Sequence, residues 1–470
     1  MTVGTVSISI TINTGHSTRH IEKEIKINEL EQAFEHLDQK MTGEVYTAVL
    51  EAMDDEIRYQ VPDTWQNVGR EPRSIVLAHG WVTFYRRIYL DEHGQRVKPL
   101  DVILGIAAYA RNSLKVQEMG SVLASQTTYR QGAKSLSFML KTDISPSSIM
   151  RMVWHTGQRI MEQEEAFRSD VPGKISAPVL YGESDGVWLH LQHEKERRKE
   201  VRVATVYTGK KPIGKDRYEA INKLVFTQLG GNTREWQIHL RELIDHTYRL
   251  SDTQLLVAGG DGNLWVRQSF DLLNLPQTFL LDRFHVVRAL RRSFGRDLVI
   301  KDVKKKLFSE GFEAISGDLS ACILKVRGKK KENMQDTYQY LQNHQDALID
   351  LDKRGLPDIA FCKLGTIEGV VDKSVVHRMK GRGCSWRIPG AQFMLAVLRH
   401  LHELIDHSFQ YPLIPPTGNY INQVKTAAGQ LTYQPMSGSI SLFHGGDQSK
   451  PWVQLLKHKL NIGLSLNSYL

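Results

Sequence analysis

LLVAGGDGNLWV, residues 255–266, is the stretch of this chain that decides its fold. Its first four residues are apolar, and a short apolar run predicts a strand that is buried on both faces. Two glycines follow, and then Asp261 and Gly262. A carboxylate at the end of a buried strand often presents charge to a site, although D-G is also a frequent turn dipeptide. The interpretation therefore depends on other acidic residues in comparable positions.

Two such residues are present. Asp185 lies in VLYGESDGVWLHL, and Glu368 lies in GTIEGVVDKSVVHRMK. The second segment predicts a helix, and Glu368 stands near its first turn, so we expect its side chain to point along the sheet edge toward the strand ends rather than to bulk water. Asp372, one turn further on the same face, is the reserve candidate. Apolar residues every four positions predict the buried stripe of this helix, namely Ile367, Val371, Val375 and Met379.

Composition and charge limit the classes to which the chain can belong. Its 470 residues are enough for two to four domains. Its net charge is +9, and a basic excess favours an anionic partner, most commonly nucleic acid, although a merely soluble basic protein is the alternative. Its 3 cysteines are too few for a disulfide framework, and it has no signal peptide and no membrane-spanning apolar run. We therefore expect a cytoplasmic, nucleoid-associated protein with no membrane partner.

The N-terminal third is predicted to be mostly helical. A strand is expected in 1–15, a helix in about 28–59 and a hairpin in 74–90. Within the helical residues that follow, one helix is expected at about 129–140, and Ser145-Pro146 caps and opens a second. This is the outline of a DNA-reading helix-turn-helix, although any two packed helices give the same pattern.

The middle of the chain changes to an α/β pattern. Three strands, a helix and two further strands, in this order, predict an α/β sheet. The segment after the last strand is helical and strongly basic. The expected strands are 178–191, 200–207, 221–229, the run ending at Asp261, and 279–284, and the expected helices are 233–248, a short one in 267–276, 286–354, 366–380 and 390–407.

The three acids together suggest a metal site. Two aspartates on neighbouring strands and a glutamate on a helix packed against them would form a pocket of oxygen ligands. Mg²⁺ and Mn²⁺ prefer such ligands and leave positions open for phosphate oxygens and water. Two such ions, roughly 3.5–4 Å apart, serve phosphodiester chemistry. Each acid alone also fits a turn or a helix surface, so the hypothesis depends on the set Asp185, Asp261 and Glu368.

The same residues carry a family resemblance. The element order with D, D and E resembles the ribonuclease-H-like fold of DDE transposases. The blocks SDGVW, GGDGNLW, LDRFHVVRAL and IEGVVDKSVVHRMKGRGCSWRIPG look like those of the ISLre-type bacterial insertion-sequence transposases, relatives of the Mutator-like group. The similarity runs from about Val76 to His407, and DRFH matches the C/D-x-x-H signature that follows the second Asp in such enzymes.

The resemblance implies that Asp185, Asp261 and Glu368 are the catalytic triad and the ligands of two Mg²⁺ or Mn²⁺ ions. It implies double-stranded DNA as partner, both element ends and target, bound by a homo-oligomer. It also implies a helical insertion, because 107 residues separate Asp261 from Glu368. The expected division is an N-terminal region (1–75), a hairpin and helical DNA-binding region (76–170), a ribonuclease-H-like core (171–285 and 361–410), the basic helical insertion (286–360) and a tail (411–470).

Further residues are expected around the triad. Asp282, His285 and Trp386 are accessory candidates. Trp386 is either core packing or a platform for a displaced base, and His285 is either a core histidine or a group near the scissile phosphate. Dense basic residues favour phosphate contacts over a solvated helical face. The residues expected to bind DNA are Arg288, Arg291, Arg292, Lys304, Lys305, Lys306, Arg378, Lys380, Arg382 and Arg387.

Two look-alike motifs are set aside. GKKPIGKD mimics a P-loop but ends in Asp216, where a hydroxyl should hold Mg²⁺, so a basic turn is expected and no nucleotide cofactor. His285 to Arg288 form the H-x-x-R of tyrosine recombinases, but the next tyrosine is Tyr338, inside the basic helices, and this alternative leaves the three acids unexplained.

The sequence thus predicts a transposase that hydrolyses a phosphodiester at the ends of an insertion sequence and joins the freed 3′-OH to target DNA. Two alternatives stay open. One is a transposase-derived DNA-binding regulator without catalysis, against which the presence of all three acids argues. The other is a ribonuclease-H-like nuclease that cuts without joining.

Overall fold

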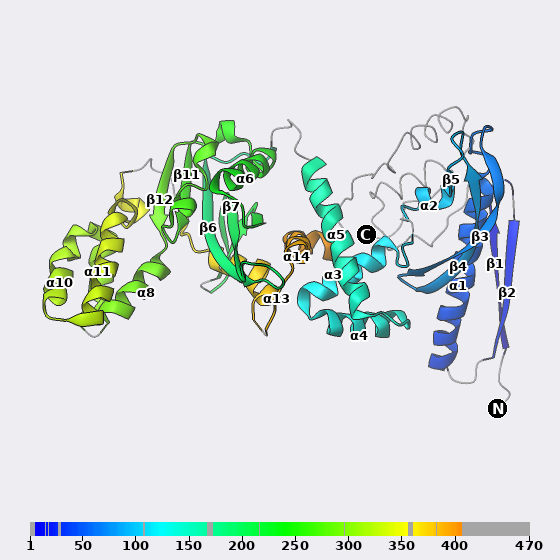
Figure 1. Ribbon diagram of the computed structural model, residues 1–470, viewed down its shortest axis with the longest axis horizontal. Helices are drawn as coiled ribbons and strands as arrows, with labels where there is room; N and C mark the ends of the chain where they lie inside the picture. Colours follow the sequence, from blue (N-terminus) through cyan, green and yellow to red (C-terminus); the bar gives the residue numbers. More distant parts are fainter. Residues whose placement is uncertain are drawn as a thin grey trace. The chain divides into compact units, whose positions relative to one another are not determined.

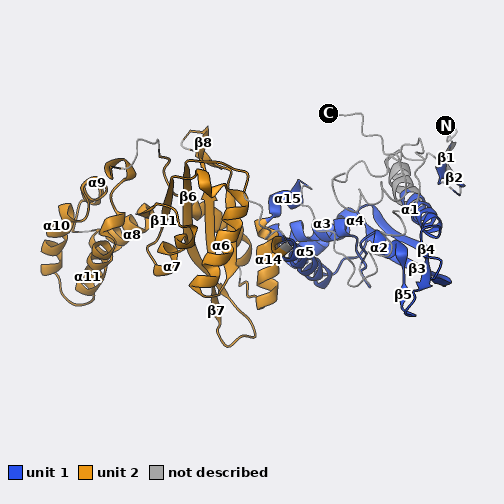
Figure 2. Cartoon of the chain, turned by 90° about the horizontal axis from the view of Figure 1, so that it is seen from above, with its two compact units in different colours: residues 1–163, 400–470 blue, residues 164–399 orange. Residues whose placement is uncertain are grey.

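The computed structural model describes residues 5–14, 16, 18–26, 30–106, 109–166, 173–215, 217–295, 297–355, 361–381 and 383–406. The chain divides into two compact units, unit 1 with residues 1–163 and 400–470, and unit 2 with residues 164–399 (Figure 2). Within the described residues, no helix is long and apolar enough to cross a membrane.

The N-terminal part of unit 1 consists of two antiparallel sheets and a long helix that packs against both (Figure 1). Its core contains Met53 of the helix and Phe84 of the second sheet, both buried. The predicted first strand, helix and hairpin are confirmed, whereas β2, in which Ile21 and Ile25 stand among charged residues, was not predicted. The elements are β1 (Thr5–Asn13) paired with β2 (Thr18–Lys26), α1 (Leu30–Ile57), the sheet of β3 (Gln66–Leu77), β4 (Gly80–Leu90) and β5 (Arg96–Val97), and α2 (Pro99–Ile103).

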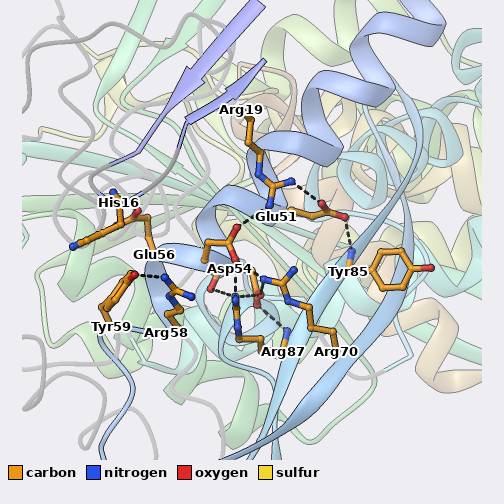
Figure 3. A network of polar contacts seen from close by, with 11 residues as sticks. His16, Arg19, Glu51, Asp54, Glu56, Arg58, Tyr59, Arg70, Tyr85 and Arg87 are labelled. Atoms are coloured by element: carbon orange, nitrogen blue, oxygen red, sulfur yellow. Dashed lines mark hydrogen bonds and ion pairs between the residues drawn. The ribbon is translucent and has the colours of Figure 1, made fainter. Parts of the chain in front are cut away.

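A network of ion pairs joins α1 to the strands around it (Figure 3). Asp54 Oδ2 lies 2.6 Å from Nη1 of Arg87 on β4, and the same guanidinium reaches Oδ1 of Asp55 at 2.9 Å. Arg19 on β2 pairs with Asp55 and with Glu51, each at 2.8 Å. Charged side chains therefore hold the helix to both sheets of this part of unit 1.

Helices form the rest of the described part of unit 1. They are α3 (Leu114–Gln126), α4 (Tyr129–Leu140), α5 (Pro146–Ala166) and α15 (Leu401–Ile405), which packs on α3. α4 ends where Lys141 adopts a left-handed conformation with φ of 47°, and Ser145 Oγ then accepts a hydrogen bond from the Ser148 amide at the start of α5. The predicted pair of helices is confirmed, and its DNA-reading role stays a prediction.

The described part of unit 2 is built on a five-stranded mixed sheet in the order β10-β7-β6-β11-β12. β7 pairs antiparallel with both β6 and β10, whereas β11 pairs parallel with both β6 and β12. Every residue of β11 is buried, as its apolar run predicted. The strands are β6 (Val179–His190), β7 (Arg198–Tyr207), β10 (Leu224–Leu229), β11 (Leu255–Gly260) and β12 (Gln277–Leu281).

Helical elements cover both faces of this sheet. One face packs on Trp236 and Leu240 of α6 (Thr233–Thr247), near α7 (Leu264–Arg267) and the 3₁₀ helices η1 (Leu250–Asp252) and η2 (Asp271–Leu273). The other face meets the segment formed by α12 (Ile367–Val371), a π-helix η5 (Asp372–Val376) and α13 (His377–Met379), and α14 (Ile388–Arg399) packs along β10. The predicted stripe is confirmed, because Ile367, Val371, Val375 and Met379 are all buried.

A helical region leaves the sheet after β12 and returns before α12. It has its own core, in which Leu290, Phe294, Leu307, Ile315 and Leu341 are buried. The prediction of a helical segment is confirmed. Its elements are α8 (Arg283–Phe294), α9 (Ile300–Glu310), α10 (Glu313–Leu324), α11 (Gly328–Asn343) and the 3₁₀ helices η3 (Gln345–Ala347) and η4 (Leu351–Lys353).

Three element boundaries differ from those expected. A hairpin of β8 (Gly209–Gly214) and β9 (Arg217–Ile221) forms where the sequence suggested a basic turn, and Asp216 lies outside the described residues. β12 ends at Leu281 because Asp282 caps α8. The expected helix 390–407 is divided at His400 into α14 and α15. The tail 411–470 lies outside the described residues.

Candidate metal centre

Three aspartates stand at the same level of the unit 2 sheet. Ser184 of β6 is paired in parallel register with Gly260 of β11, and Gly260 is paired with Leu281 of β12. The residue after each of these three is an aspartate, namely Asp185, Asp261 and Asp282. Because neighbouring parallel strands run in one direction, their register delivers three carboxylates to one edge of the sheet.

The loop that carries Asp261 is held by hydrogen bonds. The Asp261 carboxylate accepts from the backbone amide of Asn263 at 3.0 Å and from its side-chain amide at 2.5 Å. Tyr340 of α11 donates its hydroxyl to the Asp261 carbonyl at 2.9 Å. Gly262 has φ of +91°, and a Cβ there would lie 2.9 Å from Nε2 of His344, so this turn requires glycine. The helical region thus supports the Asp261 loop.

Asp282 and His285 lie one helical turn apart at the start of α8. The Asp282 carboxylate accepts from the Phe284 amide at 2.7 Å, and its other oxygen lies 4.0 Å from His285 Nε2. Glu368 of α12 joins them, because one ligand atom from each of the three residues lies within 4.8 Å of the other two. Glu368 is exposed and does not point away from water as the sequence suggested, but it does face the strand ends.

A fifth acid, Glu183, fixes the segment that bears Glu368. It is 2% exposed and lies two residues before Asp185, on the same face of β6. Its carboxylate accepts hydrogen bonds from the backbone amides of Gly365 at 2.7 Å and Thr366 at 3.0 Å, and from the Tyr207 hydroxyl at 2.7 Å. A negative charge at the first amides of a helical segment is favourable. Glu183 therefore anchors the start of α12 to β6.

The electrostatics of this edge favour a cation. Burial raises the pKa of Asp185, a hydrogen bond from the Gly186 amide lowers it, and the charges of Asp261 and Asp282 raise it further. Burial also raises the pKa of Glu200 on β7. The charge of Arg202 lowers this pKa, and the charges of Asp261 and Asp185 raise it. The negative charges of neighbouring carboxylates repel one another, and the repulsion is stronger in a partly buried site than in water because the dielectric constant is lower.

A divalent ion fits these residues. Among the described residues, no lysine or arginine forms an ion pair with Asp185, Asp261, Asp282 or Glu368. Carboxylate oxygens and one imidazole are ligands that Mg²⁺ or Mn²⁺ accepts, and a bound cation would relieve the mutual repulsion of the acids. The cluster Asp282, His285 and Glu368 could hold a metal ion. The sequence placed Asp282 and His285 beside the site only as accessory residues.

Two of the expected DNA contacts are covered in the structure. Trp386 is 6% exposed, its indole donates to the Met379 carbonyl at 2.9 Å, and its backbone pairs with Leu191, so the packing interpretation fits and base stacking does not. Arg378 is 9% exposed beneath the Trp386 ring, with its guanidinium 5.0 Å from the ring centre. Burial therefore removes Arg378 and Trp386 from the surface available to DNA.

The other expected DNA contacts are at the surface where they are described. Lys380 and Arg387 are exposed near Trp386, and Arg382 lies outside the described residues. Lys306 lies 3.9 Å from Asp318, an exposed pair of little energetic weight. The expected DNA contacts that are exposed on α8 and α9 are Arg288, Arg291, Arg292, Lys304, Lys305 and Lys306.

Comparison with known proteins gives three findings. A family model described as Uncharacterised protein family (UPF0236) matches residues 20–407. A protein of Streptococcus gallolyticus described as "UPF0236 protein in vanSb 3'region" is 26% identical over 386 residues, which cover 79% of this chain and 82% of the relative. The structure of the Drosophila P element transposase strand transfer complex is 14% identical and covers 76% of this chain and 93% of that one, with a TM-score of 0.21.

Proposed function

This chain belongs to the UPF0236 protein family, and we propose that it is a DDE transposase that cuts and joins DNA with divalent metal ions. The observation that carries the proposal is the convergence of Asp185, Asp261 and Asp282 at one sheet edge, where Glu368 and His285 meet them. The motifs that resemble ISLre-type insertion-sequence transposases lie at these same residues. A purely structural role would leave several like charges together without a counter-ion, which is costly.

The fold proposal follows from the sheet. Three antiparallel strands, β6, β7 and β10, are followed along the chain by two that run parallel to β6, and this is the order that the sequence led us to compare with ribonuclease-H-like cores. The first acid lies on the first strand, the second follows the fourth, and the last lies on a helix packed against the sheet. We assign unit 2 to this fold, with α8 to α11 as an insertion.

The residues have separate roles in the proposed reaction. Asp185, Asp261 and Glu368 would hold two Mg²⁺ or Mn²⁺ ions, which supply Lewis acidity to the oxygens of the scissile phosphodiester. Asp282 lies beside both Asp261 and His285, so it can complete the ligand set and orient the imidazole. His285, when protonated, can donate to a phosphate oxygen. Glu183 acts through α12 as a positioning residue.

The test is a cleavage and strand-transfer assay on DNA that carries the element ends, with Mn²⁺ or Mg²⁺. Asp185→Asn, Asp261→Asn and Glu368→Gln should each lower cleavage by a factor of about 100 or more, because each removes a charged ligand of the reacting centre, while DNA binding persists. The matched control is Asp245→Asn on the outer surface of α6, which should keep full activity.

Several outcomes would change the proposal. Full cleavage by any of the three variants would remove that residue from the centre, and loss of activity in Asp372→Asn but not in Glu368→Gln would transfer the role to Asp372. Cleavage in excess EDTA would overturn the metal mechanism. Cutting without joining would favour the nuclease, and DNA binding without cutting would favour the regulator.

The surface proposed to bind DNA lies on the helical region. Neutral substitutions at Lys304, Lys305 and Lys306 should weaken binding to specific and random DNA alike. The slope of log affinity against log salt should become shallower by about 0.9 for each phosphate that the variant no longer neutralises. The control keeps the charge by replacing the same lysines with arginine, and it should keep the slope. Weaker binding to the specific DNA alone would instead make this surface a reader of sequence.

A further inference from the structure

Unit 1 contains a cavity that the proposed reaction does not use. Its volume is about 530 Å³, a size that suits a small ligand or one unit of a polymer. It lies between α5 and the loop that precedes α3, and the start of α3 also contributes. The residues that line it are Tyr109, Ala110, Arg111, Asn112, Gln117, Ser148, Arg151, Met152, His155 and Arg159.

The lining of this cavity is basic. Arg151, His155 and Arg159 recur every four residues and so share one face of α5, and Arg111 adds a third guanidinium. No lining residue is acidic, and Arg111 and Arg151 form no ion pair within the described ranges. Burial and the charges of Arg159 and Arg151 lower the pKa of His155, so the positive charge of the lining comes from its arginines. The arrangement therefore favours an anion in the cavity.

Gln117 supplies a second, independent requirement. It is 6% exposed, and its Nε2 donates to the Asn112 carbonyl at 2.9 Å. Its Oε1 is buried and has no hydrogen-bond partner among the described atoms. A buried acceptor without a donor destabilises the fold, because it has lost its hydrogen bonds to water and gained none in return. A ligand that brings a hydroxyl or amino hydrogen to this atom would remove that cost.

Tyr109 gives the cavity an aromatic rim. It is 93% exposed although it lines the cavity, and its φ of 63° is uncommon for a residue with a side chain. An exposed aromatic ring beside arginines is a platform on which a nucleobase can stack. The cavity thus combines sites for an anion, a hydrogen-bond donor and a planar ring.

We propose that this cavity binds one nucleotide unit, with its phosphate on Arg111 and Arg151, a donor of its base or sugar on Gln117 Oε1, and its base on Tyr109. The nucleotide is either part of bound DNA or a free nucleotide. The site is separate from the P-loop look-alike and lies in the other unit from the metal centre. Its binding test therefore succeeds or fails independently of DNA cleavage.

The experiment measures binding by the full-length protein of dAMP, of deoxyadenosine without phosphate, and of a DNA duplex in a salt titration. dAMP should bind, and deoxyadenosine should bind at least tenfold more weakly. Arg151→Gln and Arg111→Gln should each weaken dAMP binding roughly tenfold, because each removes a charge-assisted hydrogen bond. The control is Arg96→Gln on β5, which removes an equal charge from the same unit, away from the cavity.

The two sources give different results. If DNA supplies the nucleotide, the two cavity variants also weaken duplex binding, the salt slope falls by about 1, and dAMP competes with the duplex. If the nucleotide is free, dAMP binding falls while duplex binding is unchanged. The proposal is overturned if Arg151→Gln and Arg111→Gln bind both dAMP and the duplex as well as Arg96→Gln does.

Discussion

The two clusters of acidic side chains, one in each unit, differ in how their charges are neutralised. In unit 1, Asp54 and Asp55 on α1 each contact a guanidinium directly, and Arg87 joins both (Figure 3). In unit 2, Asp185 and Asp261 gather at one sheet edge, and no lysine or arginine among the described residues pairs with them. The unit 1 acids lie on one helix and the unit 2 acids come from neighbouring elements, but acids are gathered together in both places, so acidity alone does not identify a site.

The difference separates acids that stabilise the fold through ion pairs from acids that are available to bind a cation. Burial raises the pKa of Asp54 although Arg87 opposes the shift, whereas hydrogen bonds from Arg19 and Arg87 lower the pKa of Asp55 against the effect of burial. At Asp185, burial and the neighbouring aspartates act together to raise the pKa. Acids that have counter-ions fix the fold, and acids without them call for an added cation.

The largest effect on stability should come from breaking the unit 1 network. Asp54→Ala leaves Arg87 buried without its main partner and should lower the free energy of unfolding by roughly 3–5 kcal/mol. Urea unfolding followed by circular dichroism measures this change. Asp245→Ala, at an exposed pair on α6, should cost no more than about 1 kcal/mol. Equal destabilisation of the two variants would mean that the network does not carry the stability of unit 1.

A bound metal ion should stabilise the folded protein through the acids of unit 2, which have no counter-ion, and not through the paired acids of unit 1. Mn²⁺ at about 100 times its dissociation constant should raise the free energy of unfolding of the wild type by about 2.7 kcal/mol. In Asp261→Asn most of this stabilisation should be absent. Urea unfolding with and without Mn²⁺ tests the expectation in the absence of DNA. Equal stabilisation of Asp261→Asn would place the ion elsewhere.

Tyr340 offers a smaller test of how the Asp261 loop is supported. Tyr340→Phe removes the hydrogen bond to the Asp261 carbonyl and should cost about 0.5–1.5 kcal/mol. It should also weaken Mn²⁺ binding, because the loop then holds its carboxylate less firmly. Tyr338→Phe on the same helix is the control. Lower stability without any change in Mn²⁺ binding would give Tyr340 a structural role only.

The smallest expected effect is a gain in stability, not a loss. Without metal, Asp185→Asn should stabilise the chain by at most a few °C in Tm, because it removes one of the repelling charges. The pKa of Asp185 is raised in the folded chain, so ionised Asp185 is a penalty that is fully present above this folded pKa. The advantage of the variant should disappear below the unfolded pKa of about 3.9, where the wild-type residue is protonated in both states. A lower Tm at pH 7 would contradict this account.

Local patterns were sufficient to predict most elements of the fold. The apolar run before Asp261, the spacing of the stripe from Ile367 to Met379 and the Ser145-Pro146 cap each gave an element that the structure confirms. β2 and the β8–β9 hairpin were missed, because their sequences hold several charged residues and lack a clear apolar alternation.

The site was harder to predict because it depends on tertiary contacts. Glu183 sits in an apolar strand two residues before Asp185, but only the folded chain shows it at the first amides of α12. Trp386 and Arg378 were predicted as possible DNA contacts, but their burial against each other depends on packing that the local sequence does not show. The parallel register that aligns Asp282 with the two other aspartates is likewise a property of the sheet.

The helical region between β12 and α12 has one consequence for how this protein can vary. The chain leaves the core at Asp282 and returns to it at Glu368, and the side chains of these two residues lie within 4.8 Å of the same imidazole. The two ends of the helical region therefore lie close together in the folded chain. The free energy of closing such a loop grows only by about 0.6 kcal/mol for each doubling of its length. Residues could therefore be added to or removed from the helical region while Asp185, Asp261, Asp282 and Glu368 keep their positions.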